Sequence, residues 1–296
     1  TTPIVDFVRR YAQSGTARLH MPGHKGQSLL GCGGDITEIR GADELYEAEA
    51  SSPGASQRHP AVRHGPHLLQ HRGSSQCIRA MLCLALQGAP RTGKRPVLLA
   101  ARNAHKALLY AAALLDFDIR WLWPAPEDTG ALCSCPVTVQ AFPPPLRSWP
   151  AGENTFGVYL TSPDYLGGMQ DIAALSVVCD AHGVPLLVDN AHGAYLRFLP
   201  GGSRHPINLG AAACCDSGHK TLPVLTGGAY LHLAQGPRAG GKYRAQRAGA
   251  VRLHQPSYLI LQSLDACNRL LSTDYPARLQ ECCDRLAALR ARLNAL

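Results

Sequence analysis

Asp216-Ser-Gly-His-Lys-Thr-Leu222 places a lysine between a histidine and a threonine, shortly before a Gly-Gly pair and an apolar strand. A lysine amine can form a Schiff base with an aldehyde, and pyridoxal phosphate carries an aldehyde. Ser217 and His219 could bind the phosphate of such a cofactor, while Lys220 would bind its aldehyde carbon. The motif alone leaves a second interpretation open, in which Lys220 is an ordinary lysine of a surface loop.

Upstream of this lysine, Leu186-Leu-Val-Asp-Asn-Ala-His192 runs from an apolar strand into an acidic residue. A carboxylate at that place can pair with a protonated pyridine nitrogen, which keeps the ring an electron sink. The alternative is that Asp189 caps the following helix, as acidic residues at strand ends often do.

Two groups earlier in the sequence also allow either a cofactor-binding or a purely structural interpretation. Gly73-Ser-Ser75 opens an expected helix, and small hydroxyl residues with free N–H groups at a helix start form an anion site. They could equally be an ordinary helix cap. His105 follows an apolar run and could stack on a flat cofactor, or it could be a partly buried histidine. The order and spacing of all four groups is more specific than any one of them.

Expected strands and helices alternate between residues 75 and 190, which predicts an α/β fold with a mostly parallel sheet. Because ligands bind at the carboxyl ends of such strands, the residues after each strand matter most. The apolar patterns predict helices at 3–13, 75–86, 104–115, 172–182, 259–271 and 276–296, and strands at 96–100, 119–123, 158–160, 185–188 and 228–233.

Taken together, these stretches resemble the major domain of the ornithine, lysine and arginine decarboxylases, which are fold-type I pyridoxal-phosphate enzymes. The resemblance extends over residues 1 to about 275. It also rests on Leu19-His-Met-Pro-Gly-His-Lys-Gly26, Asp35-Ile-Thr-Glu38, Gly41-Ala-Asp43, Arg102-Asn-Ala-His-Lys106, Gln255-Pro-Ser-Tyr258 and Ser263-Leu-Asp265.

This resemblance implies pyridoxal 5'-phosphate as cofactor and the decarboxylation of arginine, lysine or ornithine, a step that supplies polyamine biosynthesis. Lys220 would carry the cofactor, Asp189 would pair with the pyridine nitrogen, and His105 would stack on the ring. The implied catalytic residues are Lys220, Asp189 and His105. The implied cofactor-binding residues are Ser74, Ser75, His105, Asp189, Ala191, His192, Ser217, His219 and Lys220, with Ala191 on the second ring face and Ser74, Ser75, Ser217 and His219 at the phosphate.

The resemblance also suggests how the chain is divided. We expect an N-terminal helix and site loops over residues 1–45, the cofactor-binding major domain over 46–275, and the start of a further region over 276–296, as in a fragment of a longer protein. Residues 50–72 depart from the family, because a stretch rich in His and Arg stands where relatives have an acidic, apolar helix. We expect a poorly packed basic surface segment there, or the product of a local frameshift.

Composition bounds the remaining possibilities. Hydrophobic residues make up 46% and charged residues 17%, which excludes an intrinsically disordered chain. The net charge of +8 is spread along the sequence, so we expect no nucleic-acid partner. No apolar run is long enough to span a bilayer, and no secretory signal opens the sequence. The 11 cysteines include no C-x-x-C pair, which argues for buried, reduced thiols and against a metal site.

We therefore expect a cytoplasmic homodimer that acts on a small basic amino acid without a membrane or nucleic-acid partner. Two alternatives stay open. The chain could have another fold-type I activity, such as that of an aminotransferase or a carbon–sulfur lyase, although the Pro-Gly-His-Lys loop argues against it. It could also be an inactive cofactor-binding or structural remnant.

Overall fold

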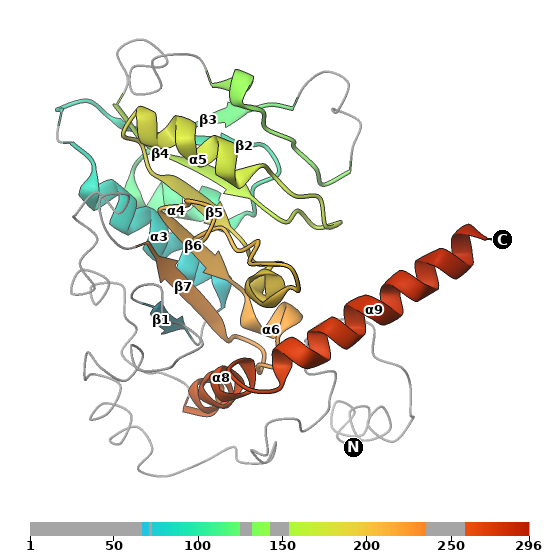
Figure 1. Ribbon diagram of the computed structural model, residues 1–296. Helices are drawn as coiled ribbons and strands as arrows, with labels where there is room; N and C mark the ends of the chain where they lie inside the picture. Colours follow the sequence, from blue (N-terminus) through green and yellow to red (C-terminus); the bar gives the residue numbers. More distant parts are fainter. Residues whose placement is uncertain are drawn as a thin grey trace, which may run out of the picture.

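The computed structural model describes residues 67–70, 73–90, 92–124, 132–142, 154–234 and 258–295. Within these residues the core is a seven-stranded sheet with the order β1-β7-β6-β5-β4-β2-β3 (Figure 1). Three expected features lie outside the described residues. They are the helix at 3–13, the motifs between residues 19 and 43, and the first three residues of Gln255-Pro-Ser-Tyr258.

Five strands of this sheet are parallel, and they are β2 (Pro96–Ala101), β3 (Asp118–Leu122), β4 (Asn154–Thr161), β5 (Leu186–Asp189) and β6 (Ala213–Asp216). At one edge β7 (Ala229–Leu233) and β1 (His67–Gln70) run antiparallel to their neighbours. The central strands are buried on both faces, which is why they consist of continuous apolar runs and not of alternating residues.

Helices cover both faces of the sheet. Helices α3 (Ser74–Gly88) and α4 (Ala107–Leu115) share one apolar cluster with the sheet, and α5 (Ile172–Ala181) packs into a separate cluster. A third cluster lies under α8 (Tyr258–Leu271), next to η5 (Ala194–Phe198) and the short helix α6 (Gly218–Thr221). The remaining elements are η3 (Val139–Ala141) and α9 (Tyr275–Asn294), the latter extending away from the sheet in Figure 1.

The predicted α/β fold with a mostly parallel sheet is confirmed, and the predicted elements differ from the observed ones mainly at their ends. Two strands were not predicted. The short apolar run of β6 contains Cys214 and Cys215, which the sequence presents only as thiols in apolar surroundings. Strand β1 lies within residues 50–72, where no strand was expected, and its backbone at residues 67–70 pairs with β7. The other residues of that segment lie outside the described part.

The cysteines follow the predicted pattern in most described positions. Six of them are buried, namely Cys77, Cys135, Cys179, Cys214, Cys215 and Cys267. Cys133 and Cys282 are exposed. Among the described residues, no helix combines the length and apolar character needed to cross a membrane.

Candidate active site

The carboxyl ends of β5 and β6 bring the two central motifs together. These neighbouring strands are parallel, and Asp189 is paired with Cys215 in their register. Asp189 therefore ends one strand beside the point where the other strand leads through Ser217 into α6. Because α6 begins immediately after β6, Lys220 lies at the same edge of the sheet as Asp189.

Lys220 is half-buried and contacts a predicted site residue from the turn that follows β5. Its Nζ lies 3.0 Å from Nε2 of His192. Burial lowers the pKa of Lys220, although the negative charge of Asp189 acts in the opposite direction. The pKa of His192 is lowered as well, by burial and by the charge of Lys220. An unprotonated His192 can therefore accept the hydrogen bond that the Lys220 amine donates.

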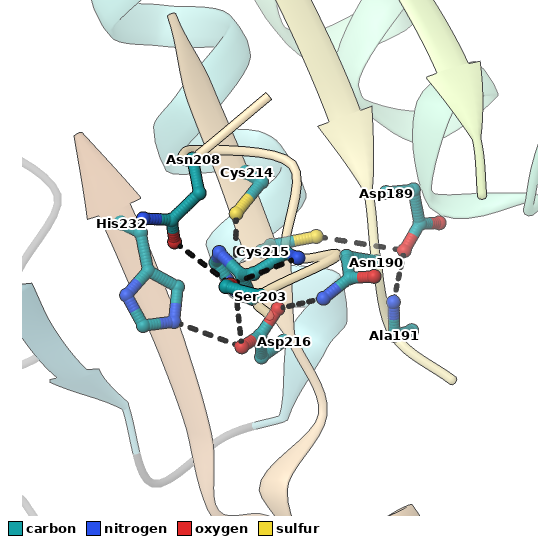
Figure 2. A network of polar contacts seen from close by, with 10 residues as sticks. Asp189, Asn190, Ala191, Ser203, Asn208, Cys214, Cys215, Asp216 and His232 are labelled. Carbon is teal, nitrogen blue, oxygen red and sulfur yellow. Dashed lines mark hydrogen bonds and ion pairs between the residues drawn. The ribbon is translucent and has the colours of Figure 1, made fainter. Parts of the chain in front are cut away.

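Asp189 is buried, with 2% of its surface exposed, and three uncharged donors reach its carboxylate. The Tyr159 hydroxyl donates to Oδ2 over 3.0 Å. The Ala191 backbone N–H and the Cys215 thiol reach Oδ1 at 3.2 and 3.5 Å (Figure 2). The capping alternative for Asp189 is wrong, because the next element, η5, begins after Gly193 and has no side-chain cap.

The residues expected at the phosphate come from two segments that the backbone connects. Gly73, with a φ of 77°, precedes α3, and its N–H donates to the Gly227 carbonyl over 2.7 Å. The next carbonyl, that of Gly228, lies 3.2 Å from Nδ1 of His219, which in turn lies 3.2 Å from the Ser217 hydroxyl. The hydroxyl residues of the α3 start, Ser74 and Ser75, are half-buried, and Gly73, not a serine, is the cap residue. The turn at Gly227 and Gly228 therefore links the α3 start to Ser217 and His219.

His105 lies between β2 and α4, near the same end of the sheet. Its side chain is partly exposed, and Nδ1 accepts the Ala107 backbone N–H over 3.2 Å. Partial burial lowers the pKa of His105, while Asp189 raises it and Lys220 lowers it further. His105 is therefore within electrostatic reach of both central residues.

Several residues of this region were not predicted. Tyr159 and Cys215 lie on strands whose sequences give only apolar signals, and their contacts with Asp189 follow from strand order. A second hydrogen-bonded network lies next to the predicted residues in sequence and in space. It joins Asn190, His205, Asp216 and His232. One atom from each of His205, Asp216 and His232 lies within 4.8 Å of the others, a spacing that could hold a metal ion. The expectation of no metal site considered only cysteine patterns and could not detect this group.

Comparison with known families decides the classification. The sequence description of the Orn/Lys/Arg decarboxylase major domain matches residues 69–296. The chain belongs to this family. Membership in the Orn/Lys/Arg decarboxylases implies pyridoxal phosphate as the cofactor.

Individual relatives are distant. The chain is 26% identical to the uncharacterized protein YaaO of Bacillus subtilis over 281 residues, which cover 89% of this chain and 55% of that protein. It is 24% identical to an arginine decarboxylase of Halalkalibacterium halodurans, with 92% and 56% covered. The chain thus spans about half the length of these relatives.

Solved structures share the fold. DndA from Streptomyces lividans superimposes with a TM-score of 0.60 at 19% identity, covering 88% of this chain and 70% of that one. The constitutive lysine decarboxylase of E. coli gives a TM-score of 0.55 at 18% identity, covering 91% of this chain and 41% of that one. These similarities place the described residues in the fold of fold-type I enzymes.

The described side chains fit pyridoxal phosphate chemically. A half-buried amine with a lowered pKa suits an aldehyde, and a buried carboxylate suits a protonated ring nitrogen. The start of a long helix with two serines, close to Ser217 and His219, suits a phosphate. All three groups lie at one end of the parallel sheet, where ligands of such folds bind.

Proposed function

We propose that the protein is a pyridoxal-phosphate-dependent decarboxylase of a basic amino acid, and that arginine is the substrate to test first. Family membership supports the reaction class. Several relatives at 22 to 24% identity are named arginine decarboxylase, which supports arginine over lysine and ornithine. The protein would release carbon dioxide and the corresponding amine.

The single observation that carries the proposal is the contact between Lys220 and His192. Their nitrogen atoms are 3.0 Å apart, and burial lowers the pKa of both side chains. A lysine must lose its proton before its nitrogen can bond to an aldehyde. Burial favours the uncharged amine, so Lys220 loses that proton more readily than a lysine in water does.

Bound pyridoxal phosphate would supply an electron sink for the bond to the substrate carboxylate. In this proposal Lys220 holds the aldehyde end, Asp189 holds a proton on the ring nitrogen, and His192 exchanges a proton with Lys220 Nζ. His105 and Ala191 would contact the two ring faces. The phosphate would be bound by Ser74, Ser75, Ser217 and His219.

Borohydride reduction tests the cofactor attachment. The purified protein is incubated with pyridoxal phosphate, reduced, digested and mapped by mass spectrometry. We expect the reduced cofactor on Lys220, and no modification at that position in Lys220→Arg. Lys106→Ala serves as the control and should be labelled at Lys220 like the wild type. Labelling of Lys25 or Lys106 in place of Lys220 would contradict the proposal.

The substrate is tested by release of labelled carbon dioxide from carboxyl-labelled arginine, lysine and ornithine in parallel. Amino-group transfer to a 2-oxo acid is measured in the same samples, because an aminotransferase would show it without carbon dioxide release. We expect release from arginine to be fastest. Cofactor labelling of Lys220 without either reaction would instead support the inactive cofactor-binding alternative.

The proposal extends to assembly, location and organisation. We propose a homodimer in the cytoplasm, with residues 46–275 as the cofactor-binding domain between an N-terminal segment and a further region that starts at 276. Exposed apolar side chains support an interface. They lie on α4 (Leu109, Tyr110 and Leu114) and on α9 (Leu286, Leu289 and Leu293).

A further inference from the structure

A second buried carboxylate lies beside the proposed cofactor site. Asp216 ends β6, and 3% of its surface is exposed. Its Oδ2 lies 2.9 Å from Nε2 of His232 and 3.0 Å from Nε2 of His205. Its Oδ1 accepts the side-chain amide of Asn190 over 2.6 Å, as Figure 2 shows. Three nitrogen donors from three different segments therefore meet on one carboxylate.

The surroundings keep this carboxylate ionised. Burial acts to raise the pKa of Asp216, but the two imidazoles and their hydrogen bonds outweigh it, so the pKa lies well below its ordinary value. An ionised carboxylate has no proton to give, so both Nε2 atoms must be the donors. Hydrogen bonds to an ionised acceptor are stronger than those between neutral groups.

Asp216 connects directly to both halves of the proposed site. Asn190 follows Asp189, and its backbone N–H donates to the Cys215 carbonyl over 2.9 Å. The Asn190 carbonyl accepts the Gly193 N–H over 2.8 Å, which closes the turn that carries Ala191 and His192. The side-chain bond to Asp216 therefore fixes the start of this turn.

Asn190 packs closely against residue 193. A Cβ at Gly193 would lie 2.1 Å from Asn190 Oδ1, so the absence of a side chain at 193 permits the observed approach. On the other side, Asp216 is the residue immediately before Ser217. One carboxylate thus restrains the β5 turn through Asn190 and the β6 turn through its own backbone.

We propose that Asp216, held ionised by His205 and His232, is a positioning residue that fixes the 189–193 turn relative to Ser217 and so prepares the cofactor site. The proposal rests on the proposed function, because it assigns the positioned residues to pyridoxal phosphate. The competing interpretation is a metal site on the same three side chains. Two observations favour the network without a metal ion. The N···O distances of 2.9 and 3.0 Å are those of direct hydrogen bonds. Arg197 lines the same small cavity, and its positive charge would repel a metal cation.

Amide hydrogen exchange of the cofactor-free protein tests the coupling. Asp216→Asn and His232→Leu should each accelerate exchange in residues 189–193 and 217–219 together, by about tenfold. His232→Gln keeps an N–H donor near the same position and should stay close to the wild type. Leu175→Ala removes core packing under α5 and shows how much exchange rises from lost global stability alone.

Titration with pyridoxal phosphate, followed by absorbance, tests the consequence for the site. Asp216→Asn and His232→Leu should weaken cofactor binding about tenfold, the scale of one charge-assisted hydrogen bond, while His232→Gln and Leu175→Ala should bind nearly as the wild type does. The Gln and Leu pair separates the loss of a donor from a change in packing, and it keeps the test usable if Asp216→Asn fails to fold.

Each outcome decides the matter. Two results would overturn the positioning role. One is hydrogen exchange in Asp216→Asn and His232→Leu that rises no more than in Leu175→Ala. The other is unchanged cofactor affinity in both Asp216→Asn and His232→Leu. One equivalent of zinc in the purified wild type that is lost in Asp216→Asn would overturn it in favour of a metal site. If the wild type binds no pyridoxal phosphate although exchange responds as expected, the proposed function fails while the coupling of the two turns stands.

Discussion

Asp189 and Asp216 end neighbouring strands and are almost equally buried, yet their surroundings differ. Asp189 accepts bonds from a hydroxyl, a thiol and a backbone N–H. Asp216 accepts bonds from two imidazoles and an amide, and its pKa is lowered as a result. The comparison shows that burial alone does not separate the carboxylate proposed for the cofactor from its neighbour. The donors differ in kind: those of Asp189 leave it for the proposed pairing with a ring nitrogen, whereas two imidazoles already pair with Asp216, which we propose to have a positioning role.

The largest expected effect comes from removing the charge at the first carboxylate. Asp189→Asn keeps the shape of the side chain but gives no anion for a protonated ring nitrogen. Turnover should fall by a factor on the order of 100 to 1,000, while some cofactor binding remains. Steady-state decarboxylation and cofactor titration of the same preparation measure both effects, with Asp116→Asn as a surface control. Unchanged turnover would show that Asp189 does not set the ring's electronic state.

The second carboxylate should matter more for stability than the first. Asp216→Asn leaves two imidazole N–H groups facing an amide, and breaking a buried charged network of this kind costs about 3 kcal/mol of unfolding free energy. In Asp189→Asn the amide oxygen can still accept the Ala191 N–H, and the amide NH2 can donate to the Tyr159 hydroxyl, so the cost should be smaller, about 1 kcal/mol. Urea denaturation of both variants gives the ranking. The reverse order would mean that the histidines do not stabilise Asp216.

The sequence predicted one of these carboxylates and not the role of the other, for a physical reason. Asp189 ends a continuous apolar run, and Lys220 follows at a spacing typical of the family, so chain order was enough to propose roles for both. The network of Asp216 depends on His205 and His232, which lie 11 residues before and 16 residues after it. Only the antiparallel pairing of β6 and β7 brings Cys214 opposite His232 and thus His232 close to Asp216.

The same limit explains the strand that was missed at the edge of the sheet. β1 lies in a stretch with few apolar residues, and its backbone is held by pairing with β7 and not by a pattern of its own. By contrast, β2, β4 and β5 are buried on both faces and were predicted from their apolar runs. Sequence patterns therefore predict strands that form clear apolar runs, whereas β1 at the edge and the short interior strand β6 were both missed.

Tyr159→Phe sharpens the comparison by removing one donor from the first carboxylate only. The lost hydrogen bond to Asp189 should cost about 1 kcal/mol of unfolding free energy, because the phenol is fully buried and the ring still packs. Turnover should change by less than in Asp189→Asn, because the carboxylate keeps its charge. Thermal denaturation and the decarboxylation assay test both points. A loss of turnover equal to that of Asp189→Asn would mean that Tyr159 acts on the cofactor or substrate directly.

The smallest expected effect concerns pH and the histidines of the second carboxylate. Burial lowers the pKa of His232, so the native state resists a proton that the unfolded chain accepts near the ordinary value of about 6.5. This contribution to stability is present above that pH and is lost as the pH falls. Unfolding free energy measured at about pH 7.5 and about pH 5.5 should therefore drop less in His232→Gln than in the wild type, since glutamine does not titrate. His105, His192 and His219 also have lowered pKa values, but they are present in both proteins, so their contributions cancel in the difference. An equal drop in the two proteins would show that His232 takes up its proton as readily in the native state as in the unfolded one.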